Sequence, residues 1–258
     1  MGSDLKEEIR MELFYFIDNI KYLPILKNVK EGILLYRQVI KEEENFMNKI
    51  YKDLYQFTSY APMIDLTFHQ YLLNIDEPIL VHTGNKEQAK ALTPKIKDIL
   101  LENELKYIFI SHFESDECGG LDLMLEEFPQ ARVIASEVTA RQLDGFGITS
   151  DALIKRANDQ MTIGGSEFKF IGYPSEMHLW EGLLLLDLKR EILFSSDLMI
   201  RFGDPDNKIL EASLEDELVR IGEEQIPDDK KREALIRDIS KENIKFIATG
   251  HGQCIKIK

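Results

Sequence analysis

The stretch Ser111–Gly120 gathers side chains that could hold a metal ion. His112, Glu114 and Asp116 alternate along it, directly after the apolar run Tyr107–Ile110, which is typical of a buried strand. If the strand continues, all three side chains point to one face, because successive strand residues point to opposite faces. One imidazole with several carboxylates is a ligand set for iron, manganese or zinc. Taken alone, the stretch could also be a solvated acidic loop.

Three later residues favour the metal site over the acidic loop. His178, Asp197 and His251 each follow an apolar, strand-like run. Side chains at strand ends are held by a rigid scaffold while the loops above them stay open to a ligand. Each residue singly is typical of a structural role, but four such positions in one chain are not expected by accident. The sequence therefore predicts a metal centre.

The order of these residues resembles the metallo-β-lactamase superfamily in its flavodiiron version. That pattern reads His-x-Glu-x-Asp-His, followed by His, Asp and His at strand ends, and the intervals after Glu117 are similar: sixty, eighteen and fifty-three residues. Hydrolases of the superfamily carry His-x-His-x-Asp-His, a zinc-preferring set, so Glu114 is typical of the iron branch. The resemblance, from about Gly32 onward, implies an α/β fold: a metallo-β-lactamase-like αββα sandwich over residues 31–258, after an N-terminal helical extension over residues 1–30.

The resemblance also implies which residues bind metal. The expected cofactor is a pair of iron ions, with a pair of zinc ions as the alternative. A carboxylate with two oxygens can bridge two such cations. The expected ligands are His112, Glu114 and His178 for one iron, Asp116 and His251 for the other, and Asp197 as the bridge.

Glu117 is the main departure from the family pattern, which usually has histidine at this position. It is a further candidate ligand for the second iron, or it could orient a bound water. Along an extended strand, a step of one residue from Asp116 points Glu117 to the opposite face. We therefore expect Glu117 to point away from the metals.

Several residues are candidates for positions around the ligands. His69, His82, Tyr173 and Trp180 could orient a ligand or line the pocket, although each is also typical of an ordinary core position. The two cysteines, Cys118 and Cys254, each lie close in sequence to the proposed ligands. We expect them to pack beside the site, with thiolate ligation or a redox pair as the alternatives.

The resemblance suggests three functions. Flavodiiron proteins carry a flavodoxin domain after the lactamase-like region, and no phosphate-cradling loop of that kind is found here, so no FMN is expected in this chain. The first function is an oxygen-binding diiron sensor or carrier, with a signalling protein as partner. The second is an oxidoreductase that reduces O2 or NO with electrons from an external donor protein. The third is a dinuclear zinc hydrolase.

The charge and the apolar content of the chain limit the classes of partner and the location that we expect. The formal charge of −14 disfavours binding to nucleic acid or to anionic membranes. No apolar run approaches a membrane span, and the N-terminus lacks the pattern of a secretory signal, so a cytoplasmic location is expected. The hydrophobic content of 44% suffices for a large core. A homo-oligomer remains open.

The expected secondary structure alternates strands with helices, which fits two sheets between helices. A charged helix is expected over Lys41–Tyr55, where apolar residues recur every four positions. Further elements expected are strands at Gly32–Tyr36, Leu66–Leu73, Ile79–His82, Tyr107–Ser111, Val133–Ala135, Glu167–Gly172, Glu181–Leu188, Glu191–Ser195 and Ile244–Thr249, and helices at Lys86–Glu102, Glu137–Leu143, Ile209–Gly222 and Pro227–Ser240.

Overall fold

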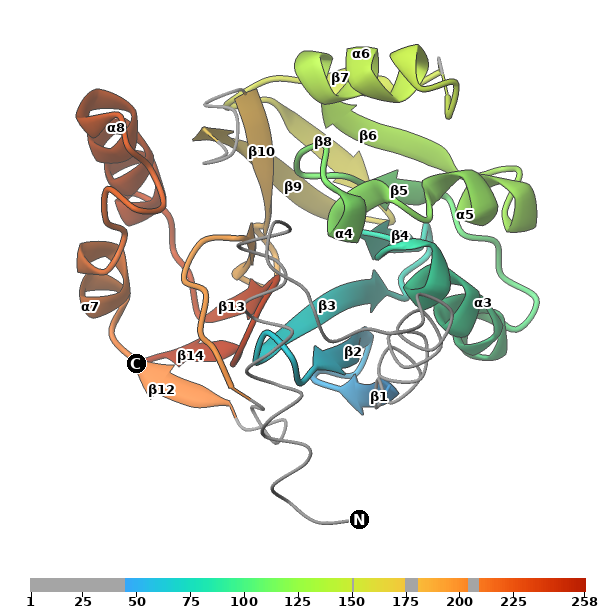
Figure 1. Cartoon of the computed structure of the whole chain (residues 1–258), viewed down its shortest axis with the longest axis horizontal. Coiled ribbons are helices and arrows are strands. Elements are labelled where there is room, and N and C mark those ends of the chain that lie inside the picture. The colour runs from blue at the N-terminus through green and yellow to red at the C-terminus, as the bar shows by residue number, and fades with distance from the viewer. Residues whose placement is uncertain (1–44, 150, 175–180, 204–208) are drawn as a thin grey trace, which may run out of the picture.

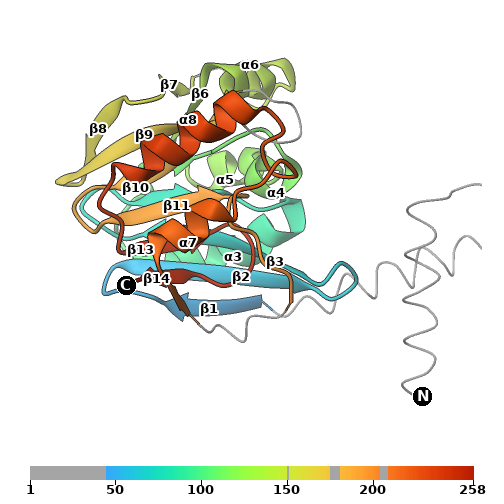
Figure 2. The same ribbon diagram turned by 90° about the vertical axis from the view of Figure 1, so that its left-hand side faces the viewer.

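The apolar runs of the sequence build two sheets that lie face to face. The computed structural model describes residues 45–149, 151–174, 181–203 and 209–258. The predicted helical extension over residues 1–30 and the strand Gly32–Tyr36 lie outside the described residues, as do His178 and Trp180. Helices cover the outer face of each sheet, which gives four layers in the order αββα (Figures 1 and 2).

The first sheet is antiparallel at one end and parallel at the other. Its first four strands pair antiparallel, and the remaining pairs are parallel. In spatial order the strands are β1 (Asn45–Lys49), β2 (Leu54–Ala61), β3 (Leu66–Leu73), β4 (Ile79–Val81), β5 (Tyr107–Phe109), β6 (Arg132–Ser136) and β7 (Leu153–Lys155).

The second sheet is mixed, with two parallel pairs among antiparallel ones. In spatial order its strands are β12 (Leu210–Ala212), β14 (Ile255–Ile257), β13 (Phe246–Thr249), β11 (Ile192–Ser196), β10 (Glu181–Asp187), β9 (Ser166–Pro174) and β8 (Gln160–Ile163).

Six helices flank the sheets in the described part of the chain. None of these helices is long and apolar enough to cross a membrane. The helices beside the first sheet are α3 (Lys86–Leu100), α4 (Ser115–Cys118), α5 (Leu121–Glu127) and α6 (Glu137–Gly145), and those beside the second are α7 (Leu214–Val219) and α8 (Asp229–Ser240) (Figure 1).

Three apolar clusters hold the four layers together. The central one lies between the sheets and includes Phe109, Phe168 and Phe170. Along β10, Leu183 and Leu185 belong to this central cluster, whereas the alternate residues Leu184 and Leu186 join the cluster beneath α8. A strand buried on both faces requires a continuous apolar run, which explains the unbroken leucines of β10.

Most predicted elements are confirmed, and one is wrong. Strand Leu66–Leu73 is found with the predicted bounds, and helix Lys86–Leu100 ends two residues early. The helix predicted over Lys41–Tyr55 is wrong, because Asn45–Lys49 and the residues from Leu54 form the antiparallel strands β1 and β2. A spacing of four residues keeps side chains on one face of a strand as well as of a helix, so the apolar pattern could not separate the two.

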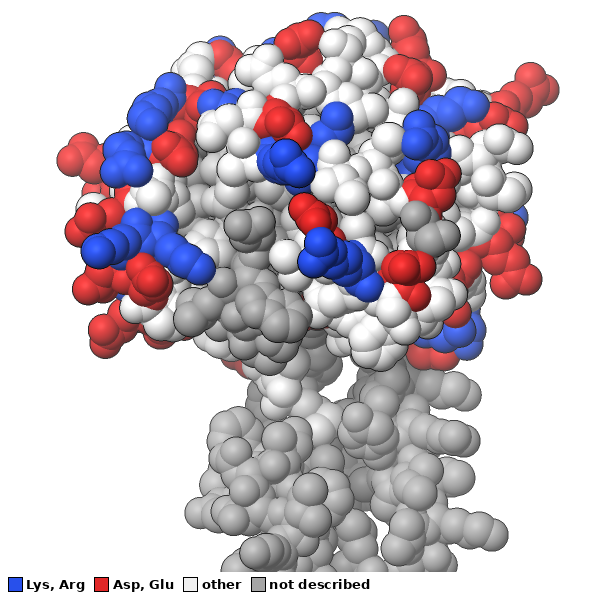
Figure 3. Space-filling model, turned by 90° about the horizontal axis from the view of Figure 1, so that it is seen from above, with Lys and Arg blue, Asp and Glu red and all other residues white. Residues whose placement is uncertain are grey.

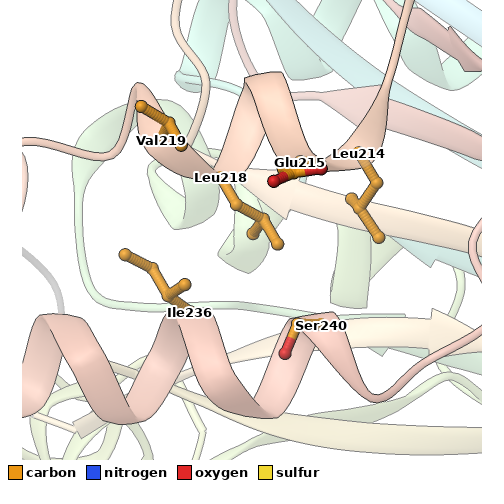
Figure 4. Close-up of a pocket in the computed structure, with 6 residues that line it drawn as sticks. All are labelled: Leu214, Glu215, Leu218, Val219, Ile236 and Ser240. Carbon is orange, nitrogen blue, oxygen red and sulfur yellow. The ribbon is translucent and has the colours of Figure 1, made fainter.

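The predicted helix Ile209–Gly222 is shorter than expected. Strand β12 occupies its beginning, and α7 starts only after Ser213, whose side chain accepts a hydrogen bond from the backbone of Asp216. Between α7 and α8 lies an apolar groove of about 410 Å³ (Figure 4). Its lining residues are Leu214, Glu215, Leu218, Val219, Ile236 and Ser240. The groove therefore offers neither imidazole nor thiol.

Arg190 ties the two sheets together at the end opposite the candidate site. It lies in the turn between β10 and β11, and its Nε donates to Asp53 Oδ2 at 3.1 Å, just before β2. Its Nη1 donates to Asp187 Oδ2 at 2.8 Å and to Ser166 Oγ at 2.8 Å. The carboxylate of Asp187 is fully buried, and this guanidinium is its charged partner beside the backbone amides of Lys189 and Arg190.

Replacing Arg190 by alanine should lower the free energy of unfolding by about 3 kcal/mol, because a buried carboxylate loses its charged partner. Urea denaturation measures the change. The matched control is Lys189→Ala in the same turn, where an exposed side chain is lost and a change within about 0.5 kcal/mol is expected. Equal effects of the two substitutions would contradict the role of Arg190.

Candidate metal centre

In the described residues, the candidate ligands converge from three separate segments. His112 and Glu114 follow β5, and Asp116 lies on α4. Asp197 follows β11 and His251 follows β13 in the other sheet. The two sheets therefore both contribute, as expected of ligands at strand ends. Of the six predicted metal ligands, these five lie in the described residues.

The local structure around Asp116 differs from the prediction. Strand β5 ends at Phe109, and Ser115–Cys118 form the short helix α4, with Glu114 as its N-cap in an extended conformation. The alternation expected along an extended strand is therefore wrong. On a helix, neighbouring residues are about 100° apart rather than 180°, so Asp116 and Glu117 can face the same pocket. Glu117 is only 2% exposed, and the prediction that it points away from the cluster is wrong.

A distortion of β11 positions Asp197. The register of the β11–β13 pair shifts between Phe194 and Ser196, as in a β-bulge. Ser196 adopts a left-handed backbone with φ of 49°, which is uncommon for a residue other than glycine. Bulges re-aim the following side chain and are frequent beside functional sites. Here the bulge turns Asp197 toward the histidines.

Asp197 lies between the two histidines. Its Oδ2 is 3.1 Å from Nε2 of His112, and its Oδ1 is 3.2 Å from Nε2 of His251. Asp116 Oδ2 approaches His251 Nε2 to 3.4 Å, and Glu114 Oε1 approaches His112 Nε2 to 3.5 Å. One carboxylate thus faces two nitrogen atoms with its two separate oxygens, which is the geometry expected of a bridge between two cations.

Glu117 completes two overlapping groups of donor atoms. His112, Glu117 and Asp197 can offer three ligand atoms within 4.8 Å of one another, and so can Asp116, Glu117 and His251. Glu117 Oε2 is 3.7 Å from His112 Nε2. The carboxylate of Glu117 therefore belongs to both candidate metal positions.

Unpaired polar atoms are concentrated in this cluster. Among the described residues, four buried side-chain atoms lack a hydrogen-bond partner, and all four are here: His112 Nε2, Glu114 Oε1, Glu117 Oε2 and Asp197 Oδ1. Such atoms are costly to bury unless another group binds them. The cluster thus has the free lone pairs that metal ligation requires.

The carboxylates of the cluster favour a bound positive charge in the pocket. Burial alone lowers the pKa of His112, but the carboxylates of Glu117, Asp197 and Glu114 hold it well above its usual value. Burial raises the pKa of Glu117 well above its usual range, partly offset by His112. Burial also opposes ionisation of Asp197, yet the imidazoles of His112 and His251 hold its pKa well below normal. Protons or metal cations would each supply this charge.

The residues fit a pair of divalent cations. The four carboxylates bring four formal negative charges, which two divalent cations would offset. The donors are imidazole nitrogen and carboxylate oxygen, which suit iron, manganese and zinc. Among the described residues, neither cysteine sulfur joins the two donor groups. The Cys118 thiol instead donates to the Glu114 carbonyl, and its burial raises its pKa to about 12.

The region between residues 66 and 252 matches a protein-family model described as "ODP family beta lactamase". The chain belongs to the ODP beta-lactamase family. A putative diflavin flavoprotein A 2 from Nostoc sp. is 28% identical over 199 residues, which are 72% of this chain and 33% of that protein. This ODP-family chain therefore spans about a third of the length of that curated relative.

Solved structures share the fold of this ODP-family chain. The metal-soaked Flv1 flavodiiron core from Synechocystis sp. has a TM-score of 0.69 at 20% identity, over 83% of this chain and 58% of that one. A metallo-beta-lactamase from Pontibacter korlensis has a TM-score of 0.59 at 18% identity, over 83% of this chain and 94% of that one. The predicted flavodiiron-like branch of the metallo-β-lactamase superfamily and its αββα fold are confirmed.

His251 is held by backbone groups of the ODP-family fold. Its Nδ1 lies 2.8 Å from the carbonyl of Thr67, which can only accept, so Nδ1 carries a proton and Nε2 faces the carboxylates of Asp197 and Asp116. His69 supports the same loop through its Nε2, 2.7 Å from the Gly252 carbonyl, while its Nδ1 lies 2.8 Å from Thr58 Oγ1. Burial lowers the pKa of His69 to about 4, so the ring is neutral near pH 7. His69 thus contacts the loop that carries His251.

His82 and Tyr173 contact the other half of the cluster. The Tyr173 ring packs edge-on against His112, with centroids 5.7 Å apart. His82 reaches His112 indirectly, because its Nε2 lies 2.9 Å from Ser111 Oγ, which is 3.0 Å from His112 Nδ1.

Sequence analysis missed three residues next to the ligands. The hydroxyl of Ser111 contacts His112 and the hydroxyl of Ser196. The hydroxyl of Thr67 accepts from the amide of Gly252, next to His251. The only signal available for the two serines was their position directly before His112 and Asp197. Their contacts join residues that are far apart in sequence, which no local pattern predicts.

Replacing Glu117 by glutamine should stabilise the protein after metal removal with a chelator. Burial raises the pKa of Glu117, so near pH 7 folding must either bury its charge or bind a proton. Glutamine avoids this cost, so the free energy of unfolding should rise by at least about 1 kcal/mol. Metal affinity should fall at the same time, because an anionic ligand is lost. Denaturant unfolding and metal titration measure the two changes. The control is Glu126→Gln, at an exposed position of α5, which should change neither quantity. A destabilised Glu117→Gln protein would contradict this account.

Proposed function

We propose that this ODP-family domain is a non-haem diiron protein that binds dioxygen, or nitric oxide as a related diatomic ligand. The observation that carries the proposal is the carboxylate of Asp197, whose two oxygens face the Nε2 atoms of His112 and His251 at 3.1 and 3.2 Å. A bridging carboxylate between two histidine-bound positions suits a two-metal centre. The similarity to flavodiiron cores supports iron as the metal.

The proposed ligands divide between the two positions as the family pattern implies. Glu117, where the family usually has histidine, adds an oxygen donor within reach of both positions. The proposed set is His112, Glu114 and His178 for the first iron, Asp116 and His251 for the second, Asp197 as the bridge, and Glu117 as an additional ligand.

The surroundings of the cluster limit what can enter. The side chains of His112 and Asp197 are 5% and 8% exposed, whereas those of Glu114 and Asp116 are 23% and 20% exposed. Access within the described residues is therefore from the side of Glu114 and Asp116. Aromatic rings close the pocket elsewhere, with Phe68 edge-on to His251 at 5.1 Å between centroids. This arrangement favours a small ligand.

Two ferrous ions in this pocket would jointly supply electrons to a diatomic ligand. The chain's own residues provide the negative charge that holds such ions, orient the imidazoles and restrict water. Whether the domain only binds O2 or also reduces it depends on electrons from outside. A sensor or carrier requires a signalling partner, and a reductase requires an external electron donor. Consumption of O2 or NO during incubation with an added reductant distinguishes the two.

The surface is compatible with a protein partner. On the face shown in Figure 3, acidic and basic side chains are interspersed, and the described residues form no continuous basic patch there. Together with the formal charge of −14, this supports a protein or small-molecule partner over nucleic acid. We further propose a cytoplasmic location and self-association of the domain.

Substituting Asp197 by alanine should reduce metal content at both positions, because one carboxylate serves two cations. We expect about two metal ions per chain in the native protein and fewer than about one in the variant. Elemental analysis measures this, and circular dichroism should show a retained fold. Asp144→Ala, which removes an exposed aspartate on α6, should keep the full metal content. Two retained ions in the Asp197 variant would remove this residue from the site.

Replacing Glu114 by histidine should shift metal preference from iron toward zinc. Imidazole suits zinc well, and one negative charge is lost. A controlled competition between Fe2+ and Zn2+ under anaerobic conditions measures the preference. Glu104→His, at an exposed position before β5, provides the control. An unchanged preference would argue against Glu114 as a ligand.

A further inference from the structure

The hydroxyl of Ser111 joins three side chains behind the metal centre. Ser111 is fully buried, and its Oγ lies 3.0 Å from His112 Nδ1, 2.9 Å from His82 Nε2 and 2.8 Å from Ser196 Oγ. A serine hydroxyl has one proton and two lone pairs, so three partners fill its hydrogen-bonding capacity. The Ser111 hydroxyl thus has a single well-defined position.

The backbone of His82 is distorted in a way that places its ring beside Ser111. His82 has a φ of 62°, in the left-handed region that few residues other than glycine adopt. Its amide donates to the Phe109 carbonyl at 2.9 Å, which fixes it against β5. Strained backbone positions tend to occur where function requires them. The strained backbone of His82 thus places its buried imidazole next to the Ser111 hydroxyl.

We propose that Ser111 is a positioning residue that accepts a hydrogen bond from the Nδ1–H of His112, held in place by His82 and Ser196. This inference rests on the proposed metal centre. When Nε2 of His112 binds a cation, the ring proton resides on Nδ1, where the Ser111 hydroxyl at 3.0 Å is the nearer acceptor and the Ser196 hydroxyl lies at 3.5 Å. Ser111 then donates its own proton to His82 Nε2 or to Ser196 Oγ, and both can accept. The relay orients the ring without adding another carboxylate to the pocket.

The same hydroxyl links ligands from the two sheets. Ser111 follows β5 of the first sheet, whereas Ser196 ends β11 of the second and directly precedes Asp197. The Ser111 carbonyl also accepts from the Leu183 amide of β10 at 2.9 Å. The pair of serine hydroxyls therefore fixes the separation between His112 and Asp197.

The two histidines are supported differently, which gives an internal control. His251 donates to the backbone carbonyl of Thr67, an acceptor that side-chain substitution does not remove. His112 depends on a side-chain hydroxyl. Removing that hydroxyl should therefore affect His112 and leave His251 as it is.

The test uses the full chain loaded with zinc as a diamagnetic probe and labelled with 15N-histidine. In the native protein, NMR should show protected Nδ1–H protons for His112 and His251. In Ser111→Ala, solvent exchange of the His112 proton should accelerate at least about tenfold, and zinc affinity should fall about 10- to 100-fold. The His251 proton should be unchanged.

Further variants separate positioning from general destabilisation. Ser166→Ala removes another buried serine hydroxyl, which accepts from Arg190 at the opposite end of β9, and should leave the His112 proton and zinc affinity unchanged. His82→Leu should reproduce part of the Ser111→Ala effect. His82→Gln keeps a polar partner for Ser111, so its His112 proton exchange and zinc affinity should be close to those of the native protein.

The outcomes distinguish this inference from the proposed function. Zinc binding in the native protein together with an unchanged His112 proton and affinity in Ser111→Ala would overturn the inference and leave the metal centre standing. A native protein that binds neither zinc nor iron would overturn both.

Discussion

Two buried and two half-buried carboxylates lie against two imidazoles where the two sheets meet, and the rest of the site depends on this interaction. Burying charge is expensive unless the charge is paired. Here the pairing is incomplete, because buried atoms of His112, Glu114, Glu117 and Asp197 lack hydrogen-bond partners. Such a cluster lowers the stability of the protein alone and favours the binding of cations. Local destabilisation by incompletely paired buried groups is typical of a functional site.

The irregular parts of the fold serve this cluster. The sheets provide rigid strand ends, but the ligands are aimed by departures from regular structure: the single turn of α4, the bulge in β11 and the left-handed residues His82 and Ser196. Other parts of the fold stabilise it: the leucines of β10 pack in the core, and Arg190 pairs with Asp53 at the opposite end of the strands. A well-packed scaffold of this kind can hold strained segments in place.

The sequence predicted the fold well because apolar runs and the turns between them are local patterns. Apolar runs ending in His, Glu or Asp marked strand ends, and the intervals between them indicated the family. The direction of Glu117 was predicted wrongly, because a strand and a short helix cannot be distinguished over four residues of mixed polarity. The Lys41–Tyr55 helix failed for a related reason, since a spacing of four suits both structures. The Ser111 contacts with His82 and Ser196 were beyond prediction because they arise only when distant segments meet.

The most direct test of the central claim is the metal content and gas response of the chain purified without oxygen. Elemental analysis should find about two irons per chain, as a two-metal site requires. The absorption spectrum recorded before and after addition of O2 should show a new visible band. Two zinc ions per chain, no spectral response to O2, and hydrolysis of a phosphodiester or thioester would contradict the account.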